Sequence, residues 1–309
     1  MIHNRKAYKL FMTLPEEERK KLSVEHEIAE IDNLEDKDWL NRFGNWRNGH
    51  NGSFWNWLWM IHFKEKYKDV KLEDIGVDMT KPIRINKKFE YPPSTRALID
   101  GKRHYDVGTK EKLPSVTTIL SGTQSEEKKA SLKAWQDKVG IDKAEQIKNE
   151  AASRGSTMHA ILEDFIDGKE RVDLTKNGKL AASMAEQIIE KGLCNVSEIW
   201  GSEVTVYYPG LYAGATDLVG IYNDKPAIID FKQSNKPKRR EWIDDYKHQL
   251  AGYALAHNKV HGTRITSGVV LMCTKDNYFQ EFVFEGDEFL EAGTEFMAKV
   301  AQYYAQRKE

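Results

Sequence analysis

The sequence predicts an α/β protein whose core has the element order αβββαβ, with a central mixed sheet flanked by helices and a helical region before it. Three observations lead to this prediction. Helical periodicity runs through residues 126–167 and about 178–192, three strand patterns follow between 203 and 231, and a further helix then precedes another strand. This alternation of helices and strands is typical of a layered α/β protein.

The composition describes a chain with enough apolar residues for a real core. Its 309 residues suffice for one large domain or two ordinary ones, and 40% of them are hydrophobic, which excludes disorder of the whole chain. The formal charge is -1, so any site for a polyanion must come from local clustering. No apolar run approaches the roughly 20 residues of a membrane helix, and no presequence is apparent. We expect a soluble, cytoplasmic protein without a membrane partner.

Residues 1–95 are expected to form a helical, Trp-rich N-terminal region of unknown role. Five of the eight tryptophans lie between residues 39 and 59. They are explained either by the aromatic packing of a small helical subdomain or by base stacking. The segment 80–96 contains three prolines and reads as an extended connection, so we place a soft boundary near residue 95 and a second domain over 96–309.

The second domain is expected to begin with a hairpin that leads into a helix over residues 103–120. The long helical pattern after it is expected to break near Gly140 and to be capped again around Ser153–Thr157. The remaining strand and helix patterns follow in order, at residues 203–208, 215–222, 226–231, 241–257, 267–273 and 278–284, with an amphipathic helix at the end of the chain.

The two strand patterns that flank Asn223-Asp224 indicate a hairpin with a tight turn. In that register Asp217 lies opposite Asp230, and cross-strand neighbours have Cβ atoms about 4.5–5.5 Å apart. Lys232 lies on the same face, two residues further along the strand. Since both faces of the hairpin carry apolar residues, we expect it to be central, and two carboxylates in such a place need a cation.

Oxygen ligands suit Mg²⁺ or Mn²⁺, which would bridge Asp217 and Asp230 and bind a phosphate oxygen and a water molecule. Such a metal ion lowers the pKa of its water and shields the charge of a phosphodiester. Lys232 could then orient the nucleophile or stabilise the transition state. The alternative, on residue types alone, is an ion pair between Asp230 and Lys232 at a strand end, with Asp217 capping a turn.

Several short motifs resemble a known family. GATDLVG, AIIDFKQ and QLAGY resemble the active-site motifs of the PD-(D/E)XK nucleases, in their RecB-type exonuclease branch. Upstream, LPSVTTIL, Trp135 and SRGSTMHAILEDFI are similar to the pattern of the mitochondrial genome maintenance exonucleases and related phage exonucleases. The resemblance spans about residues 100–285 and implies a restriction-endonuclease-like core.

The resemblance also implies roles for individual residues. It makes His159, Asp217 and Asp230 metal ligands, with the carbonyl of Phe231 a further ligand, and it makes Lys232 the catalytic lysine. The implied cofactor is Mg²⁺ or Mn²⁺. The iron-sulfur members of this branch need cysteines that the sequence lacks.

Other site residues follow from the same resemblance, and each has an ordinary structural alternative. Glu203 corresponds to an acidic residue that holds metal directly or through water, or it is a strand-end charge. Gln249 and Tyr253 correspond to residues that support the site, or they are helix surface and half-buried core. His159 and Glu163 are spaced as an ordinary pair on one helix face.

The segment after the lysine is strongly basic. Gln233 stands where Thr or Ser is common in the resembling nucleases, which puts substrate contacts in doubt more than the metal site. Four positive side chains follow within six residues: Lys236, Lys238, Arg239 and Arg240. They are either a solvated loop or contacts to backbone phosphates, in which case DNA binding is salt-dependent.

The leading hypothesis is a metal-dependent DNA exonuclease that hydrolyses phosphodiester bonds through metal-activated water. The resemblance suggests phage DNA replication, recombination or degradation, with DNA and replication or recombination proteins as partners and the host cytoplasm as the location. The first alternative is a catalytically silent DNA-binding accessory protein with a nuclease fold. The second is an unrelated metal-dependent hydrolase of a phosphate ester. The sequence has no Walker-type or GxGxxG stretch, so motor and dinucleotide chemistry have no support.

Overall fold

A six-stranded mixed sheet in the order β1-β5-β6-β7-β8-β9 forms the centre of the protein, and a three-stranded sheet has the order β2-β3-β4. The computed structural model describes residues 10, 14–15, 17–22, 58–67, 84–169, 171 and 173–307. The strands are β1 (Arg84–Ile85), β2 (Thr95–Ile99), β3 (Lys102–Asp106), β4 (Leu113–Pro114), β5 (Val196–Tyr208), β6 (Tyr212–Tyr222), β7 (Lys225–Ser234), β8 (Ser267–Thr274) and β9 (Phe279–Glu285).

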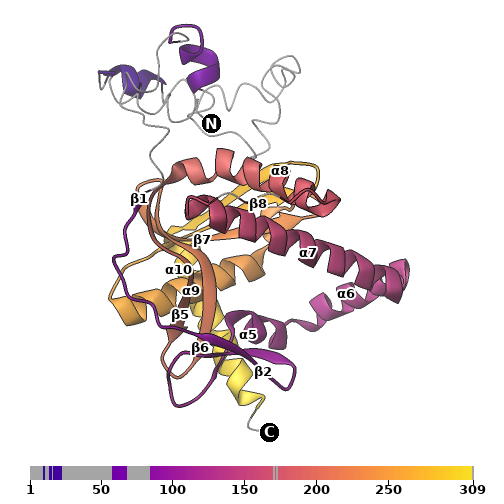
Figure 1. The fold of residues 1–309 in the computed structure, drawn as a ribbon. Helices are drawn as coiled ribbons and strands as arrows, with labels where there is room; N and C mark the ends of the chain where they lie inside the picture. The colour runs from indigo at the N-terminus through magenta and orange to yellow at the C-terminus, as the bar shows by residue number, and fades with distance from the viewer. Residues whose placement is uncertain are drawn as a thin grey trace.

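Helices cover both faces of the six-stranded sheet (Figure 1). Helices α7 and α8 pack on one face, and α9 and α10 pack on the other, together with α5. Helix α6 buries none of its residues and projects from the body of the protein. Of the helices that the structure describes, none combines the length and the apolar character needed to cross a membrane. The helices are α5 (Val116–Gly122), α6 (Glu126–Val139), α7 (Ile141–Ile166), α8 (Lys176–Lys191), α9 (Asp244–His261) and α10 (Gly286–Ala305).

The order of elements from α7 and α8 through β5, β6, β7, α9 and β8 is the αβββαβ order expected from the sequence. Strands β7 and β8 are parallel, whereas β5, β6 and β7 pair antiparallel, so the sheet is mixed. The expected fold class is therefore confirmed.

The hairpin of β6 and β7 has the predicted register. Its pairs run from Tyr222 opposite Lys225 to Leu218 opposite Ile229. The two turn residues, Asn223 and Asp224, have φ values of 44° and 63°. Positive φ at both central positions is the requirement of a type I′ turn, which Asn and Asp tolerate better than most residues.

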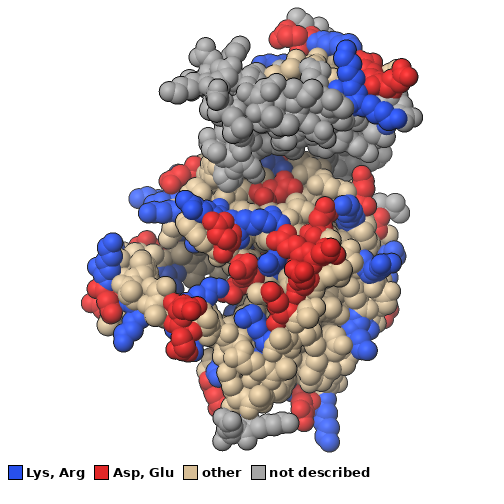
Figure 2. Space-filling view, turned by 180° about the vertical axis from the view of Figure 1, so that it is seen from behind, with Lys and Arg blue, Asp and Glu red and all other residues tan. Residues whose placement is uncertain are grey.

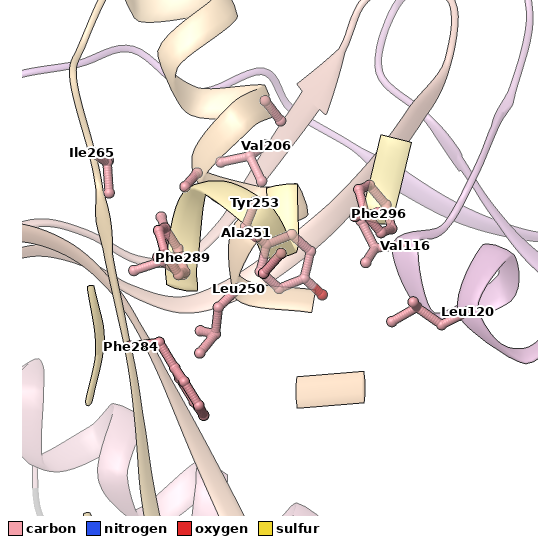
Figure 3. Close-up of a cluster of buried hydrophobic side chains, with 14 of the residues drawn as sticks. Val116, Leu120, Val206, Leu250, Ala251, Tyr253, Ile265, Phe284, Phe289 and Phe296 are labelled. Atoms are coloured by element: carbon pink, nitrogen blue, oxygen red, sulfur yellow. The ribbon is translucent and has the colours of Figure 1, made fainter. Parts of the chain in front are cut away.

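Alternate residues of the central strands enter two separate cores, as the period of a strand requires. Leu218 and Ile229 face α7 and α8, while Val219 and Ile228 face α9 and α10. All eight residues of β8 are buried, which is typical of a strand covered on both faces. Figure 3 shows the second core, in which side chains from α9 meet side chains from α5, β9 and α10; those labelled include Val116, Leu250, Tyr253, Phe284 and Phe296.

Two expectations for individual elements were wrong. Helix α6 does end at Gly140, whose φ of 85° suits glycine, but α7 runs unbroken through Ser153–Thr157. The Thr157 hydroxyl donates to the carbonyl of Ser153, so this polar residue is satisfied inside the helix without ending it. Strand β5 begins at Val196, before the start predicted at residue 203. Register shifts between Val196 and Gly201 interrupt the alternation of its side chains, so the sequence pattern did not reveal this part of the strand.

Most of the expected N-terminal region lies outside the described residues, including four of its five tryptophans. Residues 59–63 form a short π-helix. Strand β1 pairs with β5 in parallel, so the large sheet includes a strand that precedes the boundary expected near residue 95. A helical N-terminal domain stays a prediction.

Candidate active site

Strands β6 and β7 separate at Asp217 and Asp230. The ladder between them ends at Leu218 and Ile229; beyond this pair, β6 continues beside β5 and β7 beside β8. Oδ2 of Asp217 accepts a hydrogen bond of 2.6 Å from the backbone N–H of Phe231. The two aspartates therefore occupy neighbouring positions at a fork in the sheet, as the hairpin register predicts.

Helix α7 and strand β5 bring two more groups to this fork. Nδ1 of His159 lies 3.4 Å from Oδ1 of Asp217, and its ring packs edge-on against Phe231 with a centroid distance of 6.0 Å. One ligand atom each from His159, Glu203 and Asp217 lie within 4.8 Å of one another. Helix α7 and the consecutive strands β5 and β6 thus place an imidazole and two carboxylates around one point.

The backbone of Glu203 adopts an unusual conformation for a strand residue. Its φ is 51°, although its neighbours Ser202 and Val204 both pair with β6. A non-glycine residue in the left-handed region costs on the order of 1–3 kcal/mol and persists only when the surroundings hold it there. The strand therefore carries local strain at the residue whose carboxylate lies beside Asp217 and His159.

On the side of the fork that faces α9, two neighbours hold Asp230, and each of them contacts a tyrosine. Oδ2 of Asp230 forms an ion pair with Nζ of Lys232, and the Lys232 ammonium lies 5.1 Å from the ring centroid of Tyr246. Gln249 donates to Oδ1 of Asp230 at 3.2 Å and to the hydroxyl of Tyr253 at 3.0 Å. The structure thus brings together all of these predicted site residues, and it adds Tyr246, for which the sequence held no signal.

The charges of the cluster depend on one another. Burial lowers the pKa of His159, but Asp217 and Asp230 outweigh it and raise that pKa to about 9. Burial raises the pKa of Asp217, but the neighbouring His159 and Lys232 leave it below its ordinary value. In the protein without metal, His159 is therefore protonated at neutral pH and neutralises Asp217.

Two further carboxyl groups have pKa values that are raised toward neutral pH. The side chain of Glu203 is exposed, but partial desolvation and the charge of Asp217 raise its pKa to about 7. Burial raises the pKa of Asp230 to about 6 against the opposing effect of Lys232. Burial also disfavours the ammonium of Lys232, but Asp230 and Asp217 raise its pKa overall. Carboxyl groups this reluctant to ionise are stabilised when a cation joins them.

The donor set fits a divalent cation. Two carboxylates and an imidazole are the ligand types that hold Mn²⁺ and related ions, and carboxylates alone suit Mg²⁺. A cation at this point would replace the proton on His159. Asp230 adjoins the group, but its own carboxylate contacts Lys232 and Gln249.

The basic segment after β7 divides into two kinds of side chain. Arg240 is engaged within the protein: it pairs with Glu288 at 2.5 Å and lies 4.4 Å from the ring centroid of Phe284. Arg239 lies 5.2 Å from the ring centroid of Trp242. Arg240 therefore contacts α10 and β9 within the protein, which the sequence did not indicate.

Lys236 and Lys238 have no ion-pair partner in the part of the chain that the structure describes. Their backbone is fixed, because Ser234 donates to the carbonyl of Lys236 at 2.6 Å and Gln280 bonds both backbone groups of Lys238 at 2.7 Å. Elsewhere the surface is mixed: Figure 2 shows basic and acidic side chains interspersed over one face. The segment therefore keeps two lysines whose charge no described acidic side chain neutralises.

One more residue of the site was missed. Arg154 was not predicted as a site residue, although it lies in the motif SRGSTMHAILEDFI, five residues before His159. It is 7% exposed and donates to the side chains of Gln233 and Asn235, just beyond Lys232. Its position in the motif was the available signal.

No known family model matches the chain. The chain is 26% identical over 216 residues to mitochondrial genome maintenance exonuclease 1 of Xenopus tropicalis, which covers 65% of this chain and 59% of that protein. It is 27% identical over 193 residues to the Mus musculus protein of the same name, covering 57% and 56%. The chain thus spans less than two thirds of the length of these relatives. Their names confirm the resemblance to nucleases that the motifs indicate; the RecB-type branch and the phage link stay predictions.

Solved structures give weaker similarities. A protein from Eubacterium rectale matches with a TM-score of 0.37 and 16% identity, over 50% of this chain and 67% of that one. An alkaline exonuclease from Laribacter hongkongensis matches with a TM-score of 0.25 and 16% identity, over 49% and 79%. TM-scores this low support no argument about this chain.

Proposed function

We propose that the protein is a metal-dependent DNA exonuclease that uses Mg²⁺ or Mn²⁺. The observation that carries this proposal is the meeting of His159, Glu203 and Asp217 at the strand fork, directly beside the pair of Asp230 and Lys232. The sequence relatives named as exonucleases support the same reading.

In this proposal the ligands of the cation are His159, Glu203 and Asp217, with Asp230 and the carbonyl of Phe231 beside them. A bound divalent cation supplies two effects, activation of a water molecule and shielding of the phosphodiester charge. Groups of the protein itself orient the carboxylates. The backbone N–H of Phe231 fixes the orientation of Asp217, and Gln249 fixes that of Asp230.

Lys232 is assigned the role of electrostatic catalyst. Its side chain is only 19% exposed, and its raised pKa keeps it charged at neutral pH. The negative charge on the phosphoryl oxygens rearranges as the bond breaks, so a fixed cation in a site of low dielectric stabilises the transition state. Tyr246 on one side and Asp230 on the other hold the ammonium in place.

The substrate is proposed to be DNA, held in part by Lys236 and Lys238, with Arg239 at the edge of the same segment. The name of the relatives includes genome maintenance, which supports a role in DNA processing. Replication, recombination or degradation of phage DNA in a host cytoplasm remains the proposed setting. A silent DNA-binding accessory protein is disfavoured, because such a protein would not need the acids and the lysine together.

The test is cleavage of end-labelled linear DNA with Mg²⁺ or Mn²⁺. Asp230→Asn and Lys232→Met should lower the rate by at least about 10²-fold while the variants still fold and bind DNA in EDTA. The matched control is Lys225→Met, which removes a lysine from the opposite end of the same strand, where it pairs with exposed Glu285. Full turnover by both site variants would refute the proposal, as would the absence of any product from the wild-type protein.

A further inference from the structure

We propose that Arg154 binds a backbone phosphate of the DNA strand, one or two nucleotides from the phosphodiester that is cleaved. The proposal rests on the proposed function, since it takes DNA as the ligand. It gives a substrate-binding role to Arg154, which lies outside the metal cluster. It also gives a role to Gln233, which follows Lys232 at a position where the resembling nucleases commonly have Thr or Ser.

Arg154 occupies a core-facing position on α7. The buried residues of the second half of this helix are Arg154, Met158, Leu162 and Ile166, each four residues after the last. This spacing puts all four side chains on one stripe that faces the sheet. Arg154 is the charged member of this stripe, and it lies where the stripe meets the carboxyl end of β7.

The burial of this guanidinium is not balanced by a carboxylate. Arg154 is 7% exposed, and arginine is almost never so buried unless it is paired. Among residues 84–169, 171 and 173–307, no acidic side chain lies within ion-pair distance of it. Its partners are neutral amide oxygens: Gln233 accepts from Nε at 3.1 Å and from Nη2 at 2.9 Å, and Asn235 accepts from Nη2.

These bonds orient the guanidinium without neutralising it. They use Nε and Nη2, and Nη1 makes no hydrogen bond to the described residues. Three of the five N–H donors of the guanidinium are therefore used. The two N–H groups of Nη1 and the full positive charge remain for an anion such as a phosphate.

The local backbone supports this arrangement. A Cβ added at Gly155 would lie 3.2 Å from Cγ of Gln233, so glycine lets α7 approach the end of β7 closely. Glycine inside a helix costs about 1 kcal/mol relative to alanine. The side chain of Gln233 is long enough to reach the guanidinium of Arg154. The shorter side chain of Thr or Ser at the same position would not extend as far.

The position relative to the metal cluster identifies the anion. Gln233 directly follows Lys232, and consecutive strand residues point to opposite faces. Arg154 therefore lies on the α7 side of β7, where His159 also enters, and Lys232 lies on the α9 side. Along α7, the five residues from Arg154 to His159 span about 7.5 Å of helix axis. A strand of DNA that places one phosphate at the fork has another within reach of Arg154.

The test measures binding of a fluorescent single-stranded oligonucleotide in EDTA, as a function of salt. Arg154→Met should weaken binding several-fold and reduce the slope of log K against log salt by about 0.7, the value for one phosphate contact on a single strand. The matched control is Arg264→Met, an exposed arginine in the loop before β8, at the other end of the sheet. It should leave the slope unchanged.

A second variant guards against a simple folding defect. Gln233→Glu places a carboxylate against the guanidinium and neutralises it while keeping every side chain in place. If Arg154 binds phosphate, Gln233→Glu reduces binding and the salt slope as Arg154→Met does, and it adds little further loss in the Arg154→Met background. If Arg154 is only structural, Gln233→Glu keeps or raises the melting temperature and leaves the salt slope at the wild-type value.

The outcomes separate this inference from the proposed function. Unchanged binding by folded Arg154→Met and Gln233→Glu proteins overturns the role of Arg154, even if the wild-type protein cleaves DNA. Loss of binding in both variants supports it, even if the wild-type protein cleaves nothing with Mg²⁺ or Mn²⁺; that second result would overturn only the nuclease activity.

Discussion

The backbone N–H of Phe231 on β7 donates a 2.6 Å hydrogen bond to the carboxylate of Asp217 on β6, where the next ladder bond of the hairpin would be expected. A side chain thus takes the place of a main-chain partner at the point where the strands part. This bond turns Asp217 toward β7 and leaves its other oxygen for His159. The bond therefore orients the acid at the point where the two strands part.

Affinity for the metal should rise with pH. A proton and a divalent cation compete for the same atoms, and the relevant pKa values are about 7 for Glu203 and about 9 for His159. We therefore expect Mn²⁺ binding to strengthen from about pH 6 to about pH 9, with release of a proton. Calorimetric titrations in two buffers of different ionisation enthalpy measure both effects. Binding that neither changes over this range nor releases protons would contradict the assignment of His159.

Replacing Glu203 by glycine should separate stability from metal binding. Glycine accepts the φ of 51° without strain, and the change also removes a carboxylate that lies beside Asp217. We expect Glu203→Gly to stabilise the metal-free protein by about 1 kcal/mol and to weaken Mn²⁺ binding. Thermal unfolding with and without Mn²⁺ gives both numbers.

The control for that change is Asn223→Gly. Asn223 also has a positive φ, of 44°, but it lies in the turn at the far end of the hairpin. Because Asn tolerates a positive φ better than Glu does, glycine there should stabilise the protein by less, and it should leave the metal affinity unchanged. A Glu203→Gly protein that loses stability would show that the carboxylate contributes more to folding than its strain removes.

Removing the amide of Gln249 should impair catalysis more than folding. Gln249 donates to Asp230 and to Tyr253, and loss of an outer hydrogen-bond partner at a metal site typically lowers activity about 10- to 100-fold. We expect Gln249→Ala to lower kcat by about this factor. Tyr253→Phe should have a smaller effect, because Gln249 still reaches Asp230 in that variant. Equal rate losses in the two variants would show that the contact between Gln249 and Asp230 is not the one that matters.

The basic segment should respond to mutation in two different ways. Lys236→Met and Lys238→Met should each raise KM for DNA and reduce the salt slope by about 0.7, with unchanged thermal stability. Arg240→Met should instead lower the melting temperature, since Arg240 contacts Glu288 and Phe284, and should leave the salt slope near the wild-type value. A change of slope with Arg240→Met alone would reverse the assignment.

The sequence predicted those parts of the fold that depend on local chemistry. The turn at Asn223-Asp224 and the alternation of apolar residues determine the hairpin register, and the register brings Asp217 and Asp230 together. The order of helices and strands followed from periodicity in the same way. Local signals misled at the polar residues inside α7, because the Thr157 hydroxyl donates to the carbonyl of Ser153 within the helix and does not end it.

The remaining features of the site are not encoded locally. The left-handed conformation of Glu203 occurs in the middle of a strand sequence with no glycine at that position, so periodicity cannot reveal it. The opening between β6 and β7 depends on how each strand pairs with its other neighbour. Arg154 and Gln233 are far apart in the chain, and only the packing of α7 against the end of β7 brings them into contact.

The most direct test of the central claim is an anomalous diffraction map of crystals grown with Mn²⁺. The account predicts a single strong peak between the side chains of His159, Glu203 and Asp217, and loss of that peak in Asp217→Asn crystals grown under the same conditions. A peak held by other residues, or none at this fork at a Mn²⁺ concentration that supports DNA cleavage, would contradict it.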